Sequence, residues 1–365
     1  MKRFLKFFGW LFVIAVIGVI VVLFVTEPRP AMIVSYASNP DLQTIRPASQ
    51  WKGTPVDAQG RFVNHEYPFL PEFSKLWAWQ TERNPQKEEK KTDRFRLKVH
   101  TDSSFLHSSD DCIVWLGHAS YFIRLNGQTL LIDPVLGDVG RFVKRLSDLP
   151  VSPHSFKQLD YILLSHDHRD HADEYSMKLL SNNNPHTTYL TSLRLDGLLR
   201  QWTASSRIQT AGWYQQYQTD TSQIKIYFLP TRHWCRRGLT DTNQMLWGAF
   251  VLQANGKTIY FGGDTGYGSH LKEVKELFGT IDYYLVGVGA YKPEWFMGGS
   301  HMSPQSAVKA ANEMDVKMMI PMHYGTFDLS DEPIGDPYRS LQQLQQKGAI
   351  QGQLKLLEVG EILRI

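Results

Sequence analysis

The sequence of 365 residues contains only two cysteines, Cys112 and Cys235, and they do not form a CxxC pair. A disulfide framework and a cysteine-rich zinc site are therefore both excluded. Charge of one sign is also scarce, because 39 basic residues oppose 36 acidic ones and leave a net charge of +3. This near-balance gives no field that favours nucleic acid, so we expect no nucleic-acid partner. Any metal must be held by histidines and carboxylates.

Internal repeats and low-complexity blocks are absent as well, which excludes a solenoid and a long flexible linker. What is present is an ordinary globular composition, with 42% hydrophobic, 21% charged and 12% aromatic residues. These values exclude a disordered, collagen-like or polytopic membrane protein. The chain is long enough to bury a sizeable hydrophobic core.

One long apolar run lies near the amino terminus, from Phe7 to Val25, and it contains no charged residue. Its length predicts one transmembrane helix. The segment 25–28 that follows has no typical cleavage site, so we favour an uncleaved anchor over the alternative of a cleaved signal peptide. Lys2, Arg3 and Lys6 precede the run, and the positive-inside rule then keeps the amino terminus in the cytoplasm. We therefore expect a single-pass membrane protein whose catalytic domain is extracytoplasmic.

Six short apolar runs after residue 111 form the clearest structural pattern. Each is rich in β-branched or aliphatic residues and stops abruptly at a polar residue, which is typical of a buried strand. Helical patterns lie between them, for example from Pro304, which follows Ser303 as a first helical residue. Strands that alternate with helices predict an α/β layered fold. The polar residues at the ends of the runs are His118, Asp133, the cluster starting at Ser165, His233, Asp264 and His323.

The most specific motif is the segment 165–171, SHDHRDH, which places three histidines and two aspartates in one loop after a strand. Two cations, each with about four ligands, need more donors than one loop provides, and the isolated His233, Asp264 and His323 supply them. We predict that Asp264 bridges the two metals with one oxygen to each. All-nitrogen-and-oxygen ligation suits zinc first, with iron or manganese as replacements. The predicted first site is His166, His168, His233 and Asp264, and the predicted second site is Asp170, His171, Asp264 and His323.

Other polar residues receive weaker assignments. Asp133 is expected to orient a ligand histidine, with a plain cap at the strand end as the alternative. His118 could lie behind the ligands, but the sequence gives it no role. Cys235 is expected to be a buried structural thiol. Tyr291 and the segment 295–297 either line a groove for acyl chains or fill the core.

These residues carry a resemblance to a known family. HDHRDH looks like the HxHxDH motif of the metallo-β-lactamase fold, and several longer motifs resemble its N-acylphosphatidylethanolamine-hydrolysing phospholipase D branch. The resemblance implies an αββα sandwich, a dinuclear zinc site, a membrane phospholipid substrate and a homodimer. It also implies that Asp170, Asp264 and His301 are catalytic, with His301 facing the substrate. The motifs, which span Cys112 to Phe327, are HWCRR (233–237), LWG (246–248), GDTGY (263–267), GAYKPEWFM (289–297), HMSPQSAV (301–308) and HYGTF (323–327).

The resulting hypothesis is a zinc-dependent phosphodiesterase of the phospholipase D type. A metal-bridging hydroxide would attack the phosphorus of N-acylphosphatidylethanolamine and release phosphatidic acid and an N-acylethanolamine. Two alternatives remain open: hydrolysis of another ester, such as a lactone, a β-lactam or another phosphodiester, or an inactive membrane-tethered metal-binding protein. We expect three parts, with an anchor in 1–30, an extension packed on the hydrolase domain in 31–110, and the hydrolase domain in 111–365.

Overall fold

The strand β4 (Cys112–Gly117) shows why the central strands read as continuous apolar runs. Every one of its residues is buried. Val114 and Leu116 pack into one hydrophobic cluster, whereas Ile113 and Trp115 point the other way into a second cluster. A strand that is covered on both faces needs apolar residues at every position. The alternation therefore places β4 inside a layered structure.

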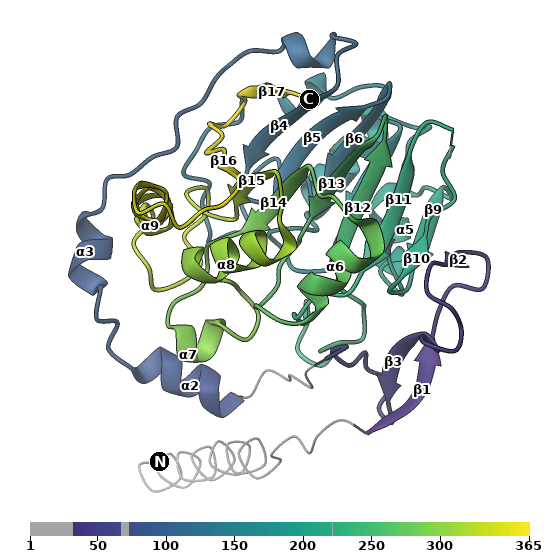
Figure 1. Ribbon diagram of the computed structural model, residues 1–365, viewed down its shortest axis with the longest axis horizontal. Helices are drawn as coiled ribbons and strands as arrows, with labels where there is room; N and C mark the ends of the chain where they lie inside the picture. The colour runs from purple at the N-terminus through teal and green to yellow at the C-terminus, as the bar shows by residue number, and fades with distance from the viewer. Residues whose placement is uncertain (1–31, 67–72, 221) are drawn as a thin grey trace, which may run out of the picture.

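The computed structural model describes residues 32–66, 73–220 and 222–365. Two β-sheets form its centre, with helices on both outer sides (Figure 1), so the predicted αββα sandwich is confirmed. The seven-stranded sheet has the order β17 (Ile362–Arg364), β4, β5 (Ser120–Leu125), β6 (Gln128–Ile132), β7 (Tyr161–Leu164), β8 (Thr188–Ser192) and β9 (Ile208–Ala211).

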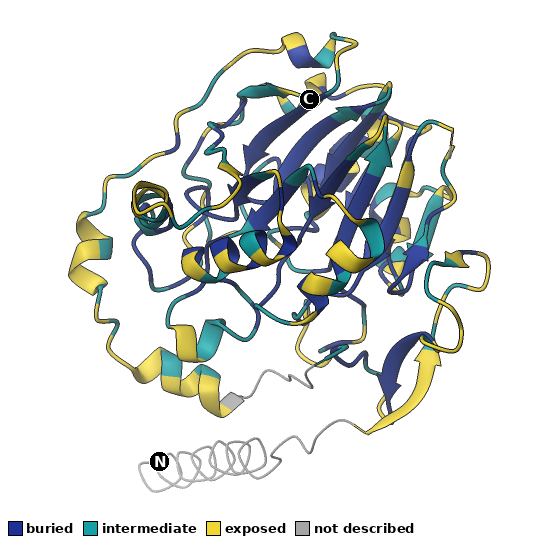
Figure 2. Cartoon of the chain, in the orientation of Figure 1, coloured by how far each residue is buried: buried dark blue, intermediate teal, exposed yellow. Residues whose placement is uncertain are grey.

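The second sheet has eight strands. The four strands at one edge, which are the last of this sheet in the sequence, are parallel to one another. Figure 2 shows that the strands of both sheets are mostly buried, while the outer helices alternate between buried and exposed residues. The order of this sheet is β16 (Gln353–Leu354), β15 (Met318–Met322), β14 (Tyr283–Gly287), β13 (Lys257–Phe261), β12 (Ala249–Ala254), β11 (Lys225–Leu229), β10 (Gln215–Gln216) and β2 (Gln43–Thr44).

Helices cover both outer faces of the sandwich. The helices α4 (Glu174–Asn183) and α5 (Asp196–Thr203) bury residues such as Met177 and Leu199 against the seven-stranded sheet. The eight-stranded sheet is covered by α6 (His270–Phe278), α8 (Pro304–Met314) and α9 (Asp336–Gln346). The predicted helix from Pro304 is confirmed, and the Ser303 side chain caps it by accepting a hydrogen bond from the Ser306 amide.

The described residues before 111, 32–66 and 73–110, wrap around the sandwich (Figure 1). The antiparallel pair of β1 (Ile33–Ala37) and β3 (Thr54–Asp57) precedes α2 (Phe73–Thr81), α3 (Lys87–Thr92) and a 3-10 turn at Ser104–Leu106. A second 3-10 turn, Pro153–Ser155, lies later in the chain. Beyond adding β2 to the sheet, this segment meets the short helix α7 (Glu294–Met297), where Trp79 stacks on Phe296 with ring centroids 5.2 Å apart. The predicted boundary between residues 110 and 111 stays a prediction.

The membrane prediction requires a correction. A helix that crosses a bilayer needs about 20 apolar residues, and the helices α8 and α9 have 11 residues each. Throughout residues 32–66, 73–220 and 222–365, no helix has the length and apolar character to cross a membrane. The predicted anchor, Phe7 to Val25, lies outside the described residues. The single-pass location with an extracytoplasmic catalytic domain is therefore not supported.

Candidate metal centre

Three strands of the eight-stranded sheet deliver side chains to one edge of the sandwich. β11 and β13 are each antiparallel to β12, and β15 follows β13 and β14 in parallel, so all three run in the same direction. His233, Asp264 and His323 follow the ends of these strands. Because strands that run in one direction end at the same edge, residues far apart in the sequence meet there.

The seven-stranded sheet does the same with three of its strands. β4 and β6 are each antiparallel to β5, and β7 is parallel to β6. His118 follows β4, Asp133 follows β6, and the segment 165–171 follows β7. The contacts described below show that both sheets present these side chains to one shared site.

A first cluster of donors consists of His166, His168, His233 and Asp264. The Nε2 atom of His166 lies 3.0 Å from His168 Nδ1, which in turn lies 3.1 Å from His233 Nε2. Three imidazole nitrogens that face one another this closely are arranged as ligands around one cation. These four residues are the set that the sequence predicts for the first site.

The second cluster consists of His118, Asp170, His171 and His323. Asp170 Oδ2 lies 3.0 Å from His118 Nε2, 3.6 Å from His323 Nε2 and 3.7 Å from His171 Nε2. The sequence predicts three of these residues for the second site. His118 is the addition that sequence reasoning left without a role.

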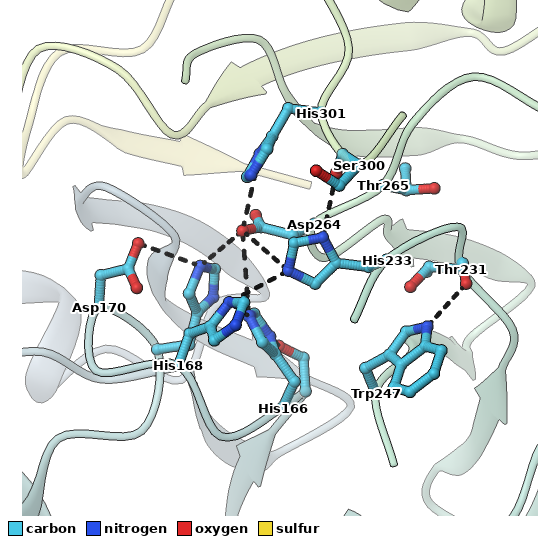
Figure 3. A network of polar contacts seen from close by, with 12 residues as sticks. His166, His168, Asp170, Thr231, His233, Trp247, Asp264, Thr265, Ser300 and His301 are labelled. Carbon is cyan, nitrogen blue, oxygen red and sulfur yellow. Dashed lines mark hydrogen bonds and ion pairs between the residues drawn. The ribbon is translucent and has the colours of Figure 1, made fainter. Parts of the chain in front are cut away.

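Asp264 is a member of the first cluster that also contacts the second, and Figure 3 shows its carboxylate next to His233 and facing His301. Its Oδ2 atom is 3.2 Å from His171 Nε2 and 3.8 Å from His233 Nε2, while its Oδ1 atom is 3.2 Å from His323 Nε2. Each cluster therefore reaches a carboxylate oxygen of the same residue. The preceding Gly263 has a φ of +57°, and a Cβ there would lie 2.7 Å from the Gly248 carbonyl oxygen, so only glycine fits this approach to Asp264.

Buried atoms without partners show that the residues fit divalent metals. Among the described residues, His171 Nε2, His323 Nε2 and Asp264 Oδ1 are buried and have no hydrogen-bond partner. Such atoms are costly unless something else satisfies them. A bound cation would satisfy them, and imidazole and carboxylate donors suit zinc, iron or manganese. The site therefore supports binding of divalent metal without selecting one element.

Neighbouring groups hold the donors in orientation. Asp133 is fully buried, and its Oδ2 atom accepts a hydrogen bond from His171 Nδ1 at 2.8 Å. This contact is the one that the predicted orienting role of Asp133 requires, and the role itself stays a prediction. His166 Nδ1 lies 2.9 Å from the Ser165 hydroxyl, and His233 Nδ1 lies 3.1 Å from the Ser300 carbonyl oxygen. These contacts leave the opposite ring nitrogens of the three histidines directed into the site.

Burial and neighbouring charges shift the pKa values of the site residues. Burial alone would raise the pKa of Asp264, but His171 and His323 hold this pKa well below its usual range. Burial lowers the pKa of His166 and that of His233, which keeps their lone pairs free to ligate. Burial opposes protonation of His323 too, but Asp264 raises the pKa of this residue to about 9. Metal binding must therefore displace protons from the site.

His301, predicted to be catalytic, lies beside Asp264 and is partly exposed. Its Nδ1 atom is 3.8 Å from Asp264 Oδ2 (Figure 3). The side chains of His301 and Asp170 are 15% and 16% exposed, whereas those of His171 and Asp264 are 0% and 2% exposed. Burial lowers the pKa of His301 to about 4, so the ring is neutral near pH 7. The side chains of His301 and Asp170 are therefore more accessible from solvent than those of His171 and Asp264.

Other residues singled out in the sequence have simpler roles. Cys235 is fully buried, as predicted, and Arg237 donates to two backbone carbonyl oxygens in the ligand loop. Tyr291 is 2% exposed and its hydroxyl contacts Asp336, so it belongs to the packed interior. Trp295 is 48% exposed, so it lies on the surface and does not fill the core.

Comparisons with known proteins agree with this geometry. The Beta-lactamase superfamily domain matches residues 128–324. The chain is 30% identical to N-acyl-phosphatidylethanolamine-hydrolyzing phospholipase D 1 of Caenorhabditis elegans, over 72% of this chain and 78% of that protein. It is also 30% identical to the mitochondrial N-acyl-phosphatidylethanolamine-hydrolyzing phospholipase D of Saccharomyces cerevisiae, over 68% of this chain and 54% of that protein.

Solved structures show the same fold. Igni18, a metallo hydrolase from Ignicoccus hospitalis, superposes with a TM-score of 0.54 at 17% identity, covering 70% of this chain and 98% of that one. The isothiocyanate hydrolase from Delia radicum gut bacteria superposes with a TM-score of 0.57 at 15% identity, covering 70% and 99%. At these identities the likeness concerns the architecture alone.

Proposed function

Since the chain belongs to the metallo-β-lactamase superfamily and is a metal-dependent hydrolase similar to the N-acylphosphatidylethanolamine-hydrolysing phospholipases D, we propose that it cleaves phospholipids of that class. The products would be phosphatidic acid and an N-acylethanolamine. The observation that carries the proposal is Asp264, whose Oδ2 atom lies 3.8 Å from His233 Nε2 in the first cluster and whose Oδ1 atom lies 3.2 Å from His323 Nε2 in the second. The substrate class rests on the names of the two relatives, and the reaction type rests on the site.

Two metal positions follow from the two donor clusters. We propose zinc at both, with His166, His168 and His233 at the first position, Asp170, His171 and His323 at the second, and Asp264 shared between them. Bound divalent metals lower the pKa of a coordinated water and polarise a phosphoryl oxygen. In the reaction, the oxygen of water bonds to phosphorus, the bond from phosphorus to the ethanolamine oxygen breaks, and a proton passes to that oxygen.

The protein's own residues orient the groups that react. Asp133 holds His171, and the Ser300 carbonyl holds His233, so both donors stay fixed when substrate enters. His301 follows the short helix α7, and its backbone amide donates to the Met297 carbonyl at 2.9 Å. Because its ring is partly exposed, it would be able to hydrogen-bond a phosphate oxygen or an acyl carbonyl of a lipid bound at the metals. We assign to His301 the role of a hydrogen-bonding group for the substrate.

Membrane phospholipid is thus the proposed partner. The homodimer implied by the resemblance stays a prediction, and so does the lack of a nucleic-acid partner. The rival reading within enzymes, hydrolysis of a lactone or a β-lactam, uses the same metal chemistry on a different substrate. Only a direct comparison of substrates separates these readings.

The test uses the purified full chain loaded with zinc. Bound metal is counted, and the protein is incubated with N-acylphosphatidylethanolamine in mixed micelles, with a lactone and with a β-lactam. We expect about two zinc ions per chain and release of N-acylethanolamine from the phospholipid. Asp264→Asn should lose both metal and activity. The matched control is Asp196→Asn, which alters a surface aspartate paired with Arg200 and should retain both.

The outcomes separate the parts of the proposal. Two metals with turnover of a lactone or β-lactam but not of the phospholipid would keep the metal site and overturn the substrate. A metal-loaded protein that turns over none of the three would favour the non-catalytic alternative. Full activity of the Asp264→Asn variant would overturn the proposed role of the bridging carboxylate.

A further inference from the structure

His118 is a buried histidine at the second cluster that neither the family comparison nor the sequence pattern assigns. Its side chain is 1% exposed, and its Nε2 atom lies 3.0 Å from Asp170 Oδ2. The same Asp170 oxygen faces His171 and His323. His118 therefore contacts the oxygen through which Asp170 meets the second metal position.

The backbone holds His118 in an unusual conformation. Its φ is +51°, a region that non-glycine residues rarely occupy. Three hydrogen bonds fix the residue there: its amide donates to the Thr326 hydroxyl at 2.7 Å, and its carbonyl accepts from the His323 amide at 3.0 Å and from Trp115 Nε1 at 2.8 Å. Backbone strain of this kind persists only where the surroundings over-determine it, and it clusters at functional sites.

The ring of His118 also has a defined orientation. Its centroid lies 4.0 Å from that of His323 and 5.1 Å from that of Phe327, so the ring packs between them. A neutral imidazole carries one ring proton. Within the part of the chain that the structure describes, Nδ1 of His118 is buried without a partner, whereas Nε2 faces a carboxylate oxygen. The proton therefore belongs on Nε2, where it makes a hydrogen bond.

From these contacts we infer that His118 is a positioning residue for the second metal position and acts through Asp170. Its Nε2–H group donates to Asp170 Oδ2 and fixes the carboxylate, while its ring supports His323. The inference deepens the proposed function, because it rests on the second metal position proposed there. Groups that orient metal ligands in this way commonly contribute about 10–100-fold to metal affinity.

The experiment measures metal binding and needs no substrate. The full-length chain and its variants are titrated with zinc against a competing chelator, and Co²⁺ is then substituted so that visible absorption reports the geometry of each position. His118→Phe keeps a ring but removes the donor, and we expect its second metal to bind about 10–100-fold more weakly. His118→Gln places an amide donor near the original Nε2 atom, and we expect it to restore both the affinity and the spectrum.

A matched control is His65→Phe. His65 also places Nε2 near a carboxylate, 3.1 Å from Glu273 Oε1, but it belongs to neither donor cluster. This variant should retain two metals with unchanged affinity. If His118→Phe does not fold, His118→Asn replaces it, because the shorter amide cannot reach Asp170.

Two results with the variants would overturn the inference. One is a donor-lacking variant that binds the second metal as tightly as the wild type. The other is a His118→Gln variant as weak as His118→Phe, which would mean that the imidazole itself ligates. A wild type that holds two metals but hydrolyses no phospholipid would leave this inference intact and remove only the proposed substrate. A wild type that holds one metal would overturn the inference directly.

Discussion

His171 Nδ1 donates a hydrogen bond of 2.8 Å to Asp133 Oδ2, and both side chains are fully buried. The same carboxylate accepts from the Ser165 amide at 2.8 Å and from the Ser165 hydroxyl at 2.5 Å. Asp133 thus joins the end of β6 to the ligand loop after β7. Because the bond fixes the other nitrogen of His171 toward Asp264, it sets the direction from which His171 meets a metal.

Asp133→Asn should weaken metal binding by about 10–100-fold. The amide has one acceptor atom where the carboxylate has two, so an NH₂ group would face a donor from Ser165 or His171. Zinc affinity measured by chelator competition checks this. The control is Asp57→Asn, a buried carboxylate that also accepts several hydrogen bonds, from Gln59 and Arg61, away from the clusters. Equal zinc affinity in the Asp133 variant and the wild type would contradict the orienting role.

Gly263→Ala should displace Asp264 and remove metal from both positions. A Cβ at this residue would lie 2.7 Å from the Gly248 carbonyl oxygen, at a φ of +57°. Gly60→Ala is the matched control, because Gly60 has a φ of +75° and nothing within 4 Å of the added carbon. The control should cost about 1 kcal/mol of stability and keep its metals. Metal content and thermal unfolding of both variants separate the effect of the Cβ clash, which only Gly263→Ala has, from that of the positive φ, which both variants share.

The free energy of unfolding should depend on Asp93 in acid. Burial alone would raise the pKa of Asp93, but hydrogen bonds from Arg339 and from the Phe95 and Gly335 amides hold this pKa at about 2. A carboxyl whose pKa is lowered in the folded state stabilises the fold above its unfolded value of 3.8, and this contribution is lost as the pH falls toward 2. Asp93→Asn should therefore be less stable than the wild type at pH 7, by on the order of 1 kcal/mol.

Thermal unfolding at several pH values tests this prediction. The difference in Tm between the wild type and Asp93→Asn should be constant from pH 7 to about 5 and should shrink between about pH 4 and pH 2. The pair of Asp110 with Arg364 offers a control, because both side chains are well exposed, at 60% and 72%. Asp110→Asn should change Tm little at any pH. A difference for Asp93→Asn that grows in acid would refute the assignment.

Removal of metal should destabilise the chain. A ligand that binds only the folded state adds about 2.7 kcal/mol when its free concentration is 100 times its Kd. Loss of the metals would also leave Asp170, the buried Asp264 and their histidines without the cation that their arrangement fits. We expect a lower Tm after treatment with EDTA, and recovery after zinc is restored. An unchanged Tm after EDTA treatment, with EDTA already saturated with zinc as the control, would argue against two bound metals.

Much of this site is predictable because its signals are local or sit at strand ends. The segment 165–171 carries the pattern within seven positions, and His233, Asp264 and His323 each follow an apolar run. His118 also follows such a run, but a single histidine has no spacing that distinguishes a ligand neighbour from a core residue. Its role becomes visible only when Asp170 is placed 3.0 Å away by the fold.

The fold, too, is predictable only in part from the sequence. Apolar runs predict strands such as β4 and β13, because strands buried on both faces need apolar residues throughout. Their pairing depends on contacts between distant segments, which local sequence does not encode. The clearest case is β2, a strand of two residues, Gln43 and Thr44, which pairs with β10 at the far edge of the sheet. A glutamine followed by a threonine is not a pattern that predicts a strand.

The arrangement of the donors has a consequence for the order of folding. His118 and Thr326, joined by a hydrogen bond, are 208 positions apart in the chain, and the two clusters draw side chains from both sheets. A partly folded chain with only one sheet in place holds at most a fraction of the ligands. High-affinity metal uptake during refolding should therefore come after the two sheets have docked. The visible absorption of bound Co²⁺ would then report the time at which the last step of assembly occurs.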